Sequence, residues 1–110
     1  MQKADHQCDR RQVKDLQQII NIGPSIAADL RQIGIQSPQQ LIGSDPVELY
    51  CAICREGGEF HDPCVLDTMM ACVDYMNGSP PKSWWSFTKR RKKQHADVVA
   101  AMREAFPVSN

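Results

Sequence analysis

Four prolines divide this chain into short segments, and each follows a residue that suits the start of a helix. Proline is well tolerated in the first turn of an α-helix, where its missing N–H has no partner to lose. A serine or aspartate just before it can cap the helix by accepting a hydrogen bond from a free amide. The four pairs are Gly23-Pro24, Ser37-Pro38, Asp45-Pro46 and Asp62-Pro63. They predict short helices that begin near residues 24, 38, 46 and 63.

Other local signals predict where these helices end and where further ones lie. The four end at Gly34, at Ile42, at Gly57-Gly58 and at Asn77-Gly78. Apolar residues at helical spacing predict two more helices, at about residues 9–20 and 95–106, whereas residues 82–93 are expected to be irregular or short. No segment alternates apolar and polar residues as a strand does. The expected fold class is therefore all-α, with about five to six short helices.

The size and charge of the chain fit one compact helical domain. A chain of 110 residues with a formal net charge of zero can bury a modest core. We expect one domain over residues 1–110, with a core at about 10–79 followed by a Trp/basic segment and a C-terminal helix at about 80–106. No apolar run approaches the length that spans a bilayer, and the N-terminus has no secretory pattern. The expected location is cytoplasmic, without a membrane partner.

The stretch "INIGPSIAADL", residues 20–30, is suited to holding an anion. Gly23 permits a close approach of the backbone to a ligand. The helix that follows presents free N–H groups and the positive end of its dipole at the same place, which favours a phosphate. Ile22 is expected to plug the turn into the core, and Ala27 and Ala28 to let two helices approach closely.

The residues "IGPSIAADLRQIGI" resemble the helix-hairpin-helix family, in which backbone amides of a hairpin hold a DNA phosphate without reading sequence. With "DPCVLDTMMACVDYM" and "WWSFTKRRK" further along, the chain resembles, over about residues 13–93, the pathogenicity-locus family. These are small bacterial helix-hairpin-helix (SAM-like) proteins that are also labelled mitomycin-resistance proteins. The resemblance implies DNA binding and no established reaction.

The same resemblance implies which residues of the turn contact a phosphate. They are Asn21, Ile22, Gly23 and Ser25. Two of them depart from the family pattern. Asn21 stands where the family usually has glycine, and asparagine tolerates the left-handed backbone that such a turn needs. Ser25 stands where the family often has a lysine or arginine, so this turn alone should bind DNA weakly.

A basic block provides a second candidate contact with DNA. It consists of Lys89, Arg90, Arg91, Lys92 and Lys93. Adjacent cations neutralise backbone phosphates, and binding of this kind is independent of sequence and sensitive to salt. Trp84, Trp85 and Phe87 precede the block, and aromatic rings near cations can stack on bases. Adjacent aromatics in a small domain more often pack in its core, so the two tryptophans are expected to be mainly structural.

The sequence also allows several alternatives. A second hairpin near "REGGEFHDPCVL" is surrounded by acidic residues and is expected to be degenerate. The pairs of metal-binding residue types could form a zinc site, although the gap between the pairs is short. These are Cys51, Cys54, His61 and Cys64.

No catalytic motif is evident, so the expectation is a non-catalytic protein without a cofactor. The rival hypothesis is a protein–protein interaction module with a purely structural hairpin, and a protein partner or a homodimer fits either reading.

Overall fold

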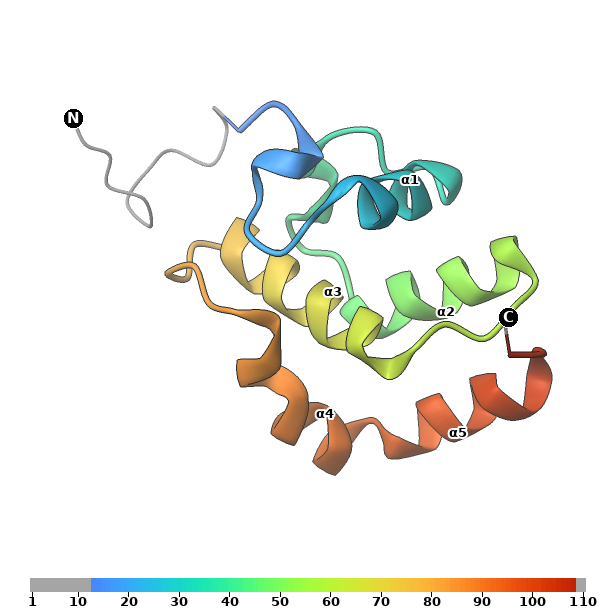
Figure 1. Cartoon of the computed structure of the whole chain (residues 1–110). Helices are drawn as coiled ribbons and strands as arrows, with labels where there is room; N and C mark the ends of the chain where they lie inside the picture. Colours follow the sequence, from blue (N-terminus) through green and yellow to red (C-terminus); the bar gives the residue numbers. More distant parts are fainter. Residues whose placement is uncertain (1–12, 109–110) are drawn as a thin grey trace.

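The computed structural model describes residues 13–108, and these form an all-helical fold (Figure 1). The elements run in the order η3, α1, η4, α2, α3, η5, α4 and α5, where η denotes a 3₁₀ helix. The α-helices are α1 (Pro24–Gln32), α2 (Pro46–Gly57), α3 (Pro63–Met76), α4 (Thr88–Gln94) and α5 (Ala96–Ala105). The 3₁₀ helices are η3 (Leu16–Gln18), η4 (Pro38–Leu41) and η5 (Trp84–Phe87). No helix within the described residues is both long enough and apolar enough to cross a membrane.

The four proline signals mark helix starts in the structure, as predicted. Pro24, Pro38, Pro46 and Pro63 each occupy the first position of a helix. The side chain of Asp45 accepts a hydrogen bond from the Val47 amide at 2.9 Å, and that of Asp62 from the Cys64 amide at 2.8 Å. These caps satisfy amides that would otherwise lack a partner at the start of α2 and α3.

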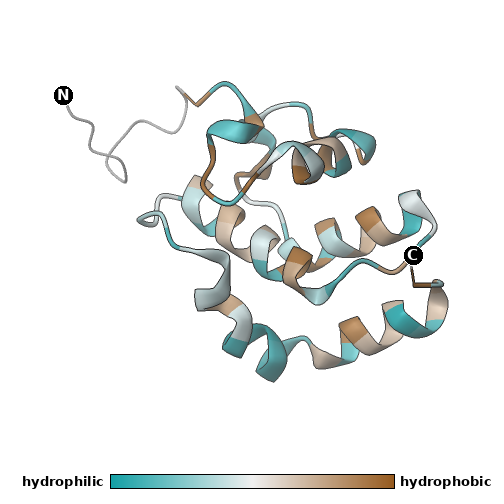
Figure 2. Ribbon diagram, viewed as in Figure 1, coloured by the Kyte–Doolittle hydropathy of each residue, from teal (hydrophilic) through white to brown (hydrophobic). Residues whose placement is uncertain are grey.

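Helix α3 is the centre of the molecule. Figure 1 shows it in the middle of the fold, with η3, α1 and η4 on one side and α4 on the other. Ten of its residues, from Val65 to Val73 and Met76, are buried. The core continues through buried residues of the other elements, namely Leu16, Ile19, Ile22, Ala27, Leu30, Leu41, Leu49, Tyr50, Ile53, Cys54, Phe60, Phe87 and Val99. Figure 2 shows the contrast with α4, which is largely hydrophilic.

The predicted helix at residues 9–20 is wrong over its described part. Only one 3₁₀ turn forms, at Leu16–Gln18, because Asp15 caps that turn and the Gln18 side chain accepts from the Lys14 and Asp15 amides. The chain leaves the turn at once, with Ile19 extended. Leu16, Ile19 and Ile22 are all buried, a spacing of three that fits this geometry, whereas Ile20 is 38% exposed. Residues 9–12 lie outside the described part of the chain.

The segment expected to be irregular or short is largely helical, and its helices are short. Residues 84–94 form η5 and α4 in succession, and α5 follows almost without a break. Thr88 and Arg91 of this segment bind the Asp67 side chain of α3, which fixes the segment against the core. The C-terminal helix predicted at 95–106 is confirmed as α5. Beyond it the chain returns to the α2–α3 loop, where the Phe60 amide donates to the Pro107 carbonyl at 2.8 Å.

Candidate nucleic-acid interface

The turn between η3 and α1, residues 19–23, has a fixed shape. Asn21 adopts a left-handed backbone with φ 77°, which asparagine tolerates better than most residues. The side chain of Ile22 is buried in the core, as predicted. Its amide donates to the Ile19 carbonyl at 3.2 Å, so this expected phosphate donor already has a partner inside the turn. Ala27 is fully buried, but Ala28 is exposed, so only the first of the two alanines serves close packing.

The start of α1 presents amides that nothing in the described chain satisfies. Within residues 13–108, the amides of Gly23, Ser25 and Ile26 make no hydrogen bond. No side chain caps this helix, and Gly23, Pro24 and Ser25 are exposed. Helices α2 and α3 differ, because Asp45 and Asp62 place carboxylates at their first amides. An anion can therefore approach the N-terminus of α1 without displacing a cap.

The loop between α2 and α3 has the opposite character. Gly58 ends α2 in a left-handed conformation with φ 68°, and Asp62 then caps α3. The carboxylate of Asp62 occupies the place that a phosphate would need, and its hydrogen bond with the Cys64 amide holds its pKa below the usual range. These facts agree with the interpretation of this second turn as degenerate.

A hydrogen bond joins the η3–α1 turn to the start of the basic segment. The side-chain amide of Asn21 donates to the Lys82 carbonyl at 2.8 Å. The Lys82 ammonium is half-exposed and lies 3.8 Å from a carboxylate oxygen of Asp74. It also lies 6.0 Å from the centre of the Phe87 ring. The backbone of Lys82 thus lies against the turn while its ammonium lies near Asp74, and Lys82 was not among the predicted site residues. Its only sequence signal is its place as the first cation after Pro80-Pro81.

The five predicted cations of the basic block divide into two groups. Lys89, Arg90, Lys92 and Lys93 are exposed on α4. Arg91 turns inward, where its Nε lies 2.8 Å from Oδ1 of the fully buried Asp67. This carboxylate raises the pKa of Arg91, chiefly through their hydrogen bond. Four cations therefore face solvent, and Arg91 already has an anionic partner inside the protein.

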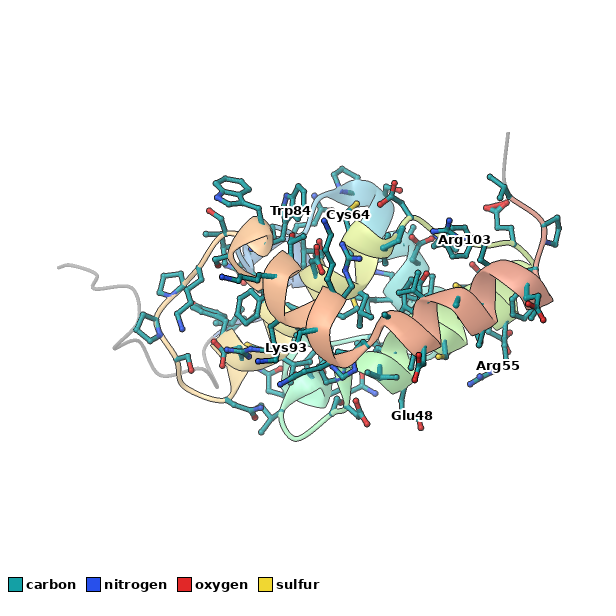
Figure 3. All side chains as sticks on the ribbon, turned by 90° about the horizontal axis from the view of Figure 1, so that it is seen from below. Glu48, Arg55, Cys64, Trp84, Lys93 and Arg103 are labelled. Carbon is teal, nitrogen blue, oxygen red and sulfur yellow. The ribbon has the colours of Figure 1, made fainter. Side chains whose placement is uncertain are left out.

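The turn and α4 do not form one continuous patch. Figure 1 shows α3 between them. Segment 82–87 connects the two regions, since Lys82 is bonded to the turn while the guanidinium of Arg90 stacks over the Phe87 ring at 5.2 Å. In Figure 3, which looks from below, Trp84 and Lys93 project on opposite sides of the η5–α4 segment.

The two tryptophans differ in environment. Trp84 is half-buried, and its ring meets that of Trp85 edge to face, with 5.8 Å between centroids and 83° between planes. Trp85 is 65% exposed, which departs from the expectation that both rings are structural. Phe87, the third aromatic residue of the segment, is the one that is buried in the core.

The cysteine and histidine residues do not converge on a metal site in the described part of the chain. No group of three or more His, Cys, Asp or Glu side chains there could hold an ion, so Cys51, Cys54, His61 and Cys64 are not brought together as ligands. Desolvation raises the pKa of the Cys64 thiol to about 11 and that of Cys72 to about 12, and it also raises the pKa of Cys51. A thiol with a raised pKa stays protonated at neutral pH and is a poor nucleophile.

A groove of about 640 Å³ runs along the last two helices. Ala96, Val99 and Ala100 form its apolar part, and Arg91, Lys92, Arg103 and Glu104 are its charged residues. No sequence pattern predicts this groove, because it depends on how α4 and α5 follow each other in the fold.

Comparison with known proteins bears on the family of this chain. A model of the Pathogenicity locus family (Cdd1) matches residues 9–93. The chain is 43% identical over 79 residues to the mitomycin resistance protein McrB of Streptomyces lavendulae, which covers 72% of this chain and 75% of that protein. No solved structure matches significantly. The family match spans the turn, the central helix and the basic block, and the chain therefore belongs to the Pathogenicity locus family.

Proposed function

We propose that this protein is a non-catalytic DNA-binding protein that contacts the phosphate backbone without sequence specificity. The observation that carries this proposal is the exposed, uncapped start of α1, where the amides of Gly23, Ser25 and Ile26 have no partner among the described residues. A phosphate oxygen is a strong acceptor for such amides, and the helix dipole favours its charge. The resemblance of this stretch to a helix-hairpin-helix turn supports the same ligand. The name of the Streptomyces lavendulae relative mentions resistance but indicates no mechanism. The proposal therefore rests on the turn.

The residues of the turn take different parts in this proposal. The amides of Gly23, Ser25 and Ile26 donate to one phosphate, and the exposed Ser25 hydroxyl can add a fourth donor. Ile22 anchors the turn through its buried side chain, while Asn21 supplies the left-handed backbone and the bond to Lys82. These two residues of the predicted site therefore act by shaping the turn.

The exposed cations of the basic segment supply the attraction that the neutral turn lacks. The backbone of Lys82 is bonded to the turn, and the exposed cations of α4 are Lys89, Arg90, Lys92 and Lys93. Contacts of this kind release counterions from DNA, so the affinity should fall as salt rises. Because only one turn holds a phosphate through backbone amides, binding is expected to be weak.

A second candidate function is a protein–protein interaction module, and the groove between α4 and α5 favours it. A volume of about 640 Å³ with an apolar stripe flanked by Lys92 and Arg103 could take an apolar side chain beside an acidic one. Under this alternative the η3–α1 turn is purely structural. The two candidates differ in a simple way, because the alternative predicts no salt-dependent binding of DNA.

The experiment that tests the proposal compares two substitutions at Gly23. A Cβ at this residue meets no atom within 4 Å and its φ of −94° suits any residue, so both variants should fold. In Gly23→Asp, the new carboxylate caps α1, which favours the helix, and at the same time blocks and repels a phosphate. Gly23→Ala keeps the amides free and adds no charge. We expect Gly23→Asp to be at least as stable as the wild type and to lose DNA binding, whereas Gly23→Ala retains it.

The measurement is fluorescence anisotropy with a labelled duplex at about 50 mM and about 200 mM salt, a range over which phosphate contacts weaken strongly. Thermal unfolding of the same samples reports their stability. Equal affinity of the Asp and Ala variants would remove the turn from the interface. An absence of binding by the wild type at the lower salt would favour the protein-interaction alternative.

A further inference from the structure

Trp85 is the most exposed large apolar side chain among the described residues. Its exposed fraction is 65%, while Phe87, two residues later in the same 3₁₀ turn, is 3% exposed. Exposing an indole ring to water is unfavourable because the ring has a large apolar surface. In η5, Phe87 is therefore part of the core, whereas Trp85 is exposed to solvent.

The exposed ring stands on a firmly held support. Phe87 anchors η5 in the core, and Ser86 closes the turn by donating from its hydroxyl to the Ser83 carbonyl at 2.6 Å. The next residue, Thr88, donates to the buried Asp67 carboxylate at 2.7 Å. The Trp84 and Trp85 rings lie nearly perpendicular to each other, and the Trp85 side chain remains 65% exposed. A ring held in this way loses little freedom when a flat ligand stacks on it.

The charges of the segment that carries this ring favour an anionic ligand. From Lys82 to Lys93 the chain carries six cations and no acid. Only Arg91 is turned to the buried Asp67, and Lys82 approaches Asp74, which leaves the cations of α4 facing solvent. A segment that combines an exposed aromatic ring with cations is suited to single-stranded nucleic acid, with bases on the ring and phosphates on the cations.

These groups follow one another along the chain, which bends around α3. The hydrogen bond between Asn21 and Lys82 sets the free amides of α1 at one end of the series. Lys82, Trp85 and α4 follow in succession, and Figure 1 shows that α3 lies between the two ends. A duplex is stiff over such short distances and resists following a bend, whereas a single strand follows it readily.

We infer that Trp85 is a stacking site for an unpaired nucleobase, so that the preferred DNA carries a single-stranded segment beside its duplex. This inference rests on the proposed function and names its class of substrate. The duplex phosphate lies at the start of α1, the strand passes Lys82, and an unpaired base stacks on the exposed ring of Trp85. The cations of α4 hold the phosphates that follow.

The test uses two labelled DNAs that differ only in the presence of bases. Both consist of the same duplex with a short overhang, which is thymine in one and abasic in the other, so their charges are equal. Stacking on an aromatic ring should make the thymine overhang bind about 5- to 100-fold more tightly than the abasic one. Trp85→Leu should abolish this ratio and leave affinity for a blunt duplex unchanged. Trp85→Phe, the matched control, should keep part of it.

A second readout does not depend on affinity. Trp84→Phe leaves Trp85 as the one tryptophan of the chain. Its fluorescence should be quenched by the thymine overhang and left unchanged by the abasic one, because stacking requires the base. Equal affinity for the two overhangs without quenching would overturn the inference, including the case in which Trp85 docks a protein instead.

The inference and the proposed function fail in distinguishable ways. If blunt duplex binds and Gly23→Asp abolishes that binding, while the two overhangs behave alike, the proposed function stands and the stacking site is refuted. If the thymine overhang quenches Trp85 while Gly23→Asp binds every DNA as the wild type does, the stacking site stands and the role of the turn is refuted.

Discussion

Asp67 is the residue whose surroundings are hardest to reconcile with a purely apolar core. Its side chain has no exposed surface, yet it lies in the middle of α3 among buried apolar neighbours. Burial of an unpaired carboxylate is strongly unfavourable. The Thr88 hydroxyl at 2.7 Å and the Arg91 Nε at 2.8 Å compensate by donating to its two oxygens. The segment that carries the candidate contacts of η5 and α4 is therefore fixed by one polar network.

Removal of Arg91 should show how much this network contributes to stability. Arg91→Met leaves the carboxylate buried with Thr88 as its remaining partner, and we expect the free energy of unfolding to fall by about 3–5 kcal/mol. Lys92→Met is the matched control, because Lys92 is the exposed neighbour in the same helix and its loss should change the free energy by no more than about 0.5 kcal/mol. Urea unfolding followed by circular dichroism measures both. Equal effects of the two substitutions would show that the buried pair makes no special contribution.

At the scale of elements, helix starts could be predicted because their signals are local. Asp45 and Asp62 bind amides two residues away, and Pro46 and Pro63 fix the backbone between them. The prediction of a helix at 9–20 was wrong for a local reason as well. The Gln18 side chain accepts hydrogen bonds from the Lys14 and Asp15 amides and limits the helix to one turn. That apolar spacing of three fits a 3₁₀ turn and an α-helix equally well.

Helix α4 and the candidate site could be predicted only in part, because their determinants lie far apart in the chain. The pairing of Arg91 with Asp67 spans 24 residues, and that of Asn21 with Lys82 spans 61. A run of basic residues shows neither which cation turns inward nor which one reaches the turn. The free amides of α1 were predictable from Gly23-Pro24, since neither residue has a side chain that can cap.

The exposed cations of α4 allow a test at the level of one element. Lys89 and Lys93 lie on one face of the helix, and their mutual repulsion does not help it to fold. The double substitution of both lysines by glutamine should leave stability unchanged or slightly higher. The slope of log affinity against log salt should fall by up to about 1.8, or about 0.9 for each phosphate contact that is lost.

The matched control for that experiment removes the same charge elsewhere. Arg31 and Arg55 are exposed near the C-terminal ends of α1 and α2. Replacing both by glutamine lowers the net charge equally. An interface on α4 predicts that the control keeps the wild-type salt slope. A similar fall in both variants would mean that DNA responds to the total charge of the protein and has no defined site.

At the scale of the whole molecule, the neutral net charge hides a division between acidic and basic parts. Between Glu56 and Pro81 the acidic residues are Glu56, Glu59, Asp62, Asp67 and Asp74, and no lysine or arginine occurs, whereas residues 82–93 hold six cations. Two of those acids form ion pairs with the basic segment, Asp67 with Arg91 and Asp74 with Lys82. The total charge of zero therefore says little about binding, and affinity for DNA must depend on orientation.

The stability of the whole fold should depend on pH through Asp62, because this residue caps the central helix. Its pKa is lowered by the hydrogen bond from the Cys64 amide, so the charged carboxylate stabilises the folded state. The contribution is fully present above the ordinary pKa of the group, about 3.9, and is lost as pH falls through the lower folded value.

Asp62→Ala removes the cap and should cost about 1 kcal/mol at neutral pH, with a smaller difference from the wild type in acid. Urea midpoints at neutral pH and at about pH 3 measure both effects, since the latter lies below the ordinary value. Asp62→Asn keeps a capping oxygen that does not titrate, so it should resemble the wild type at neutral pH and lose less stability in acid. If the deficit of Asp62→Ala were the same at both pH values, the charge of the cap would contribute nothing to the fold.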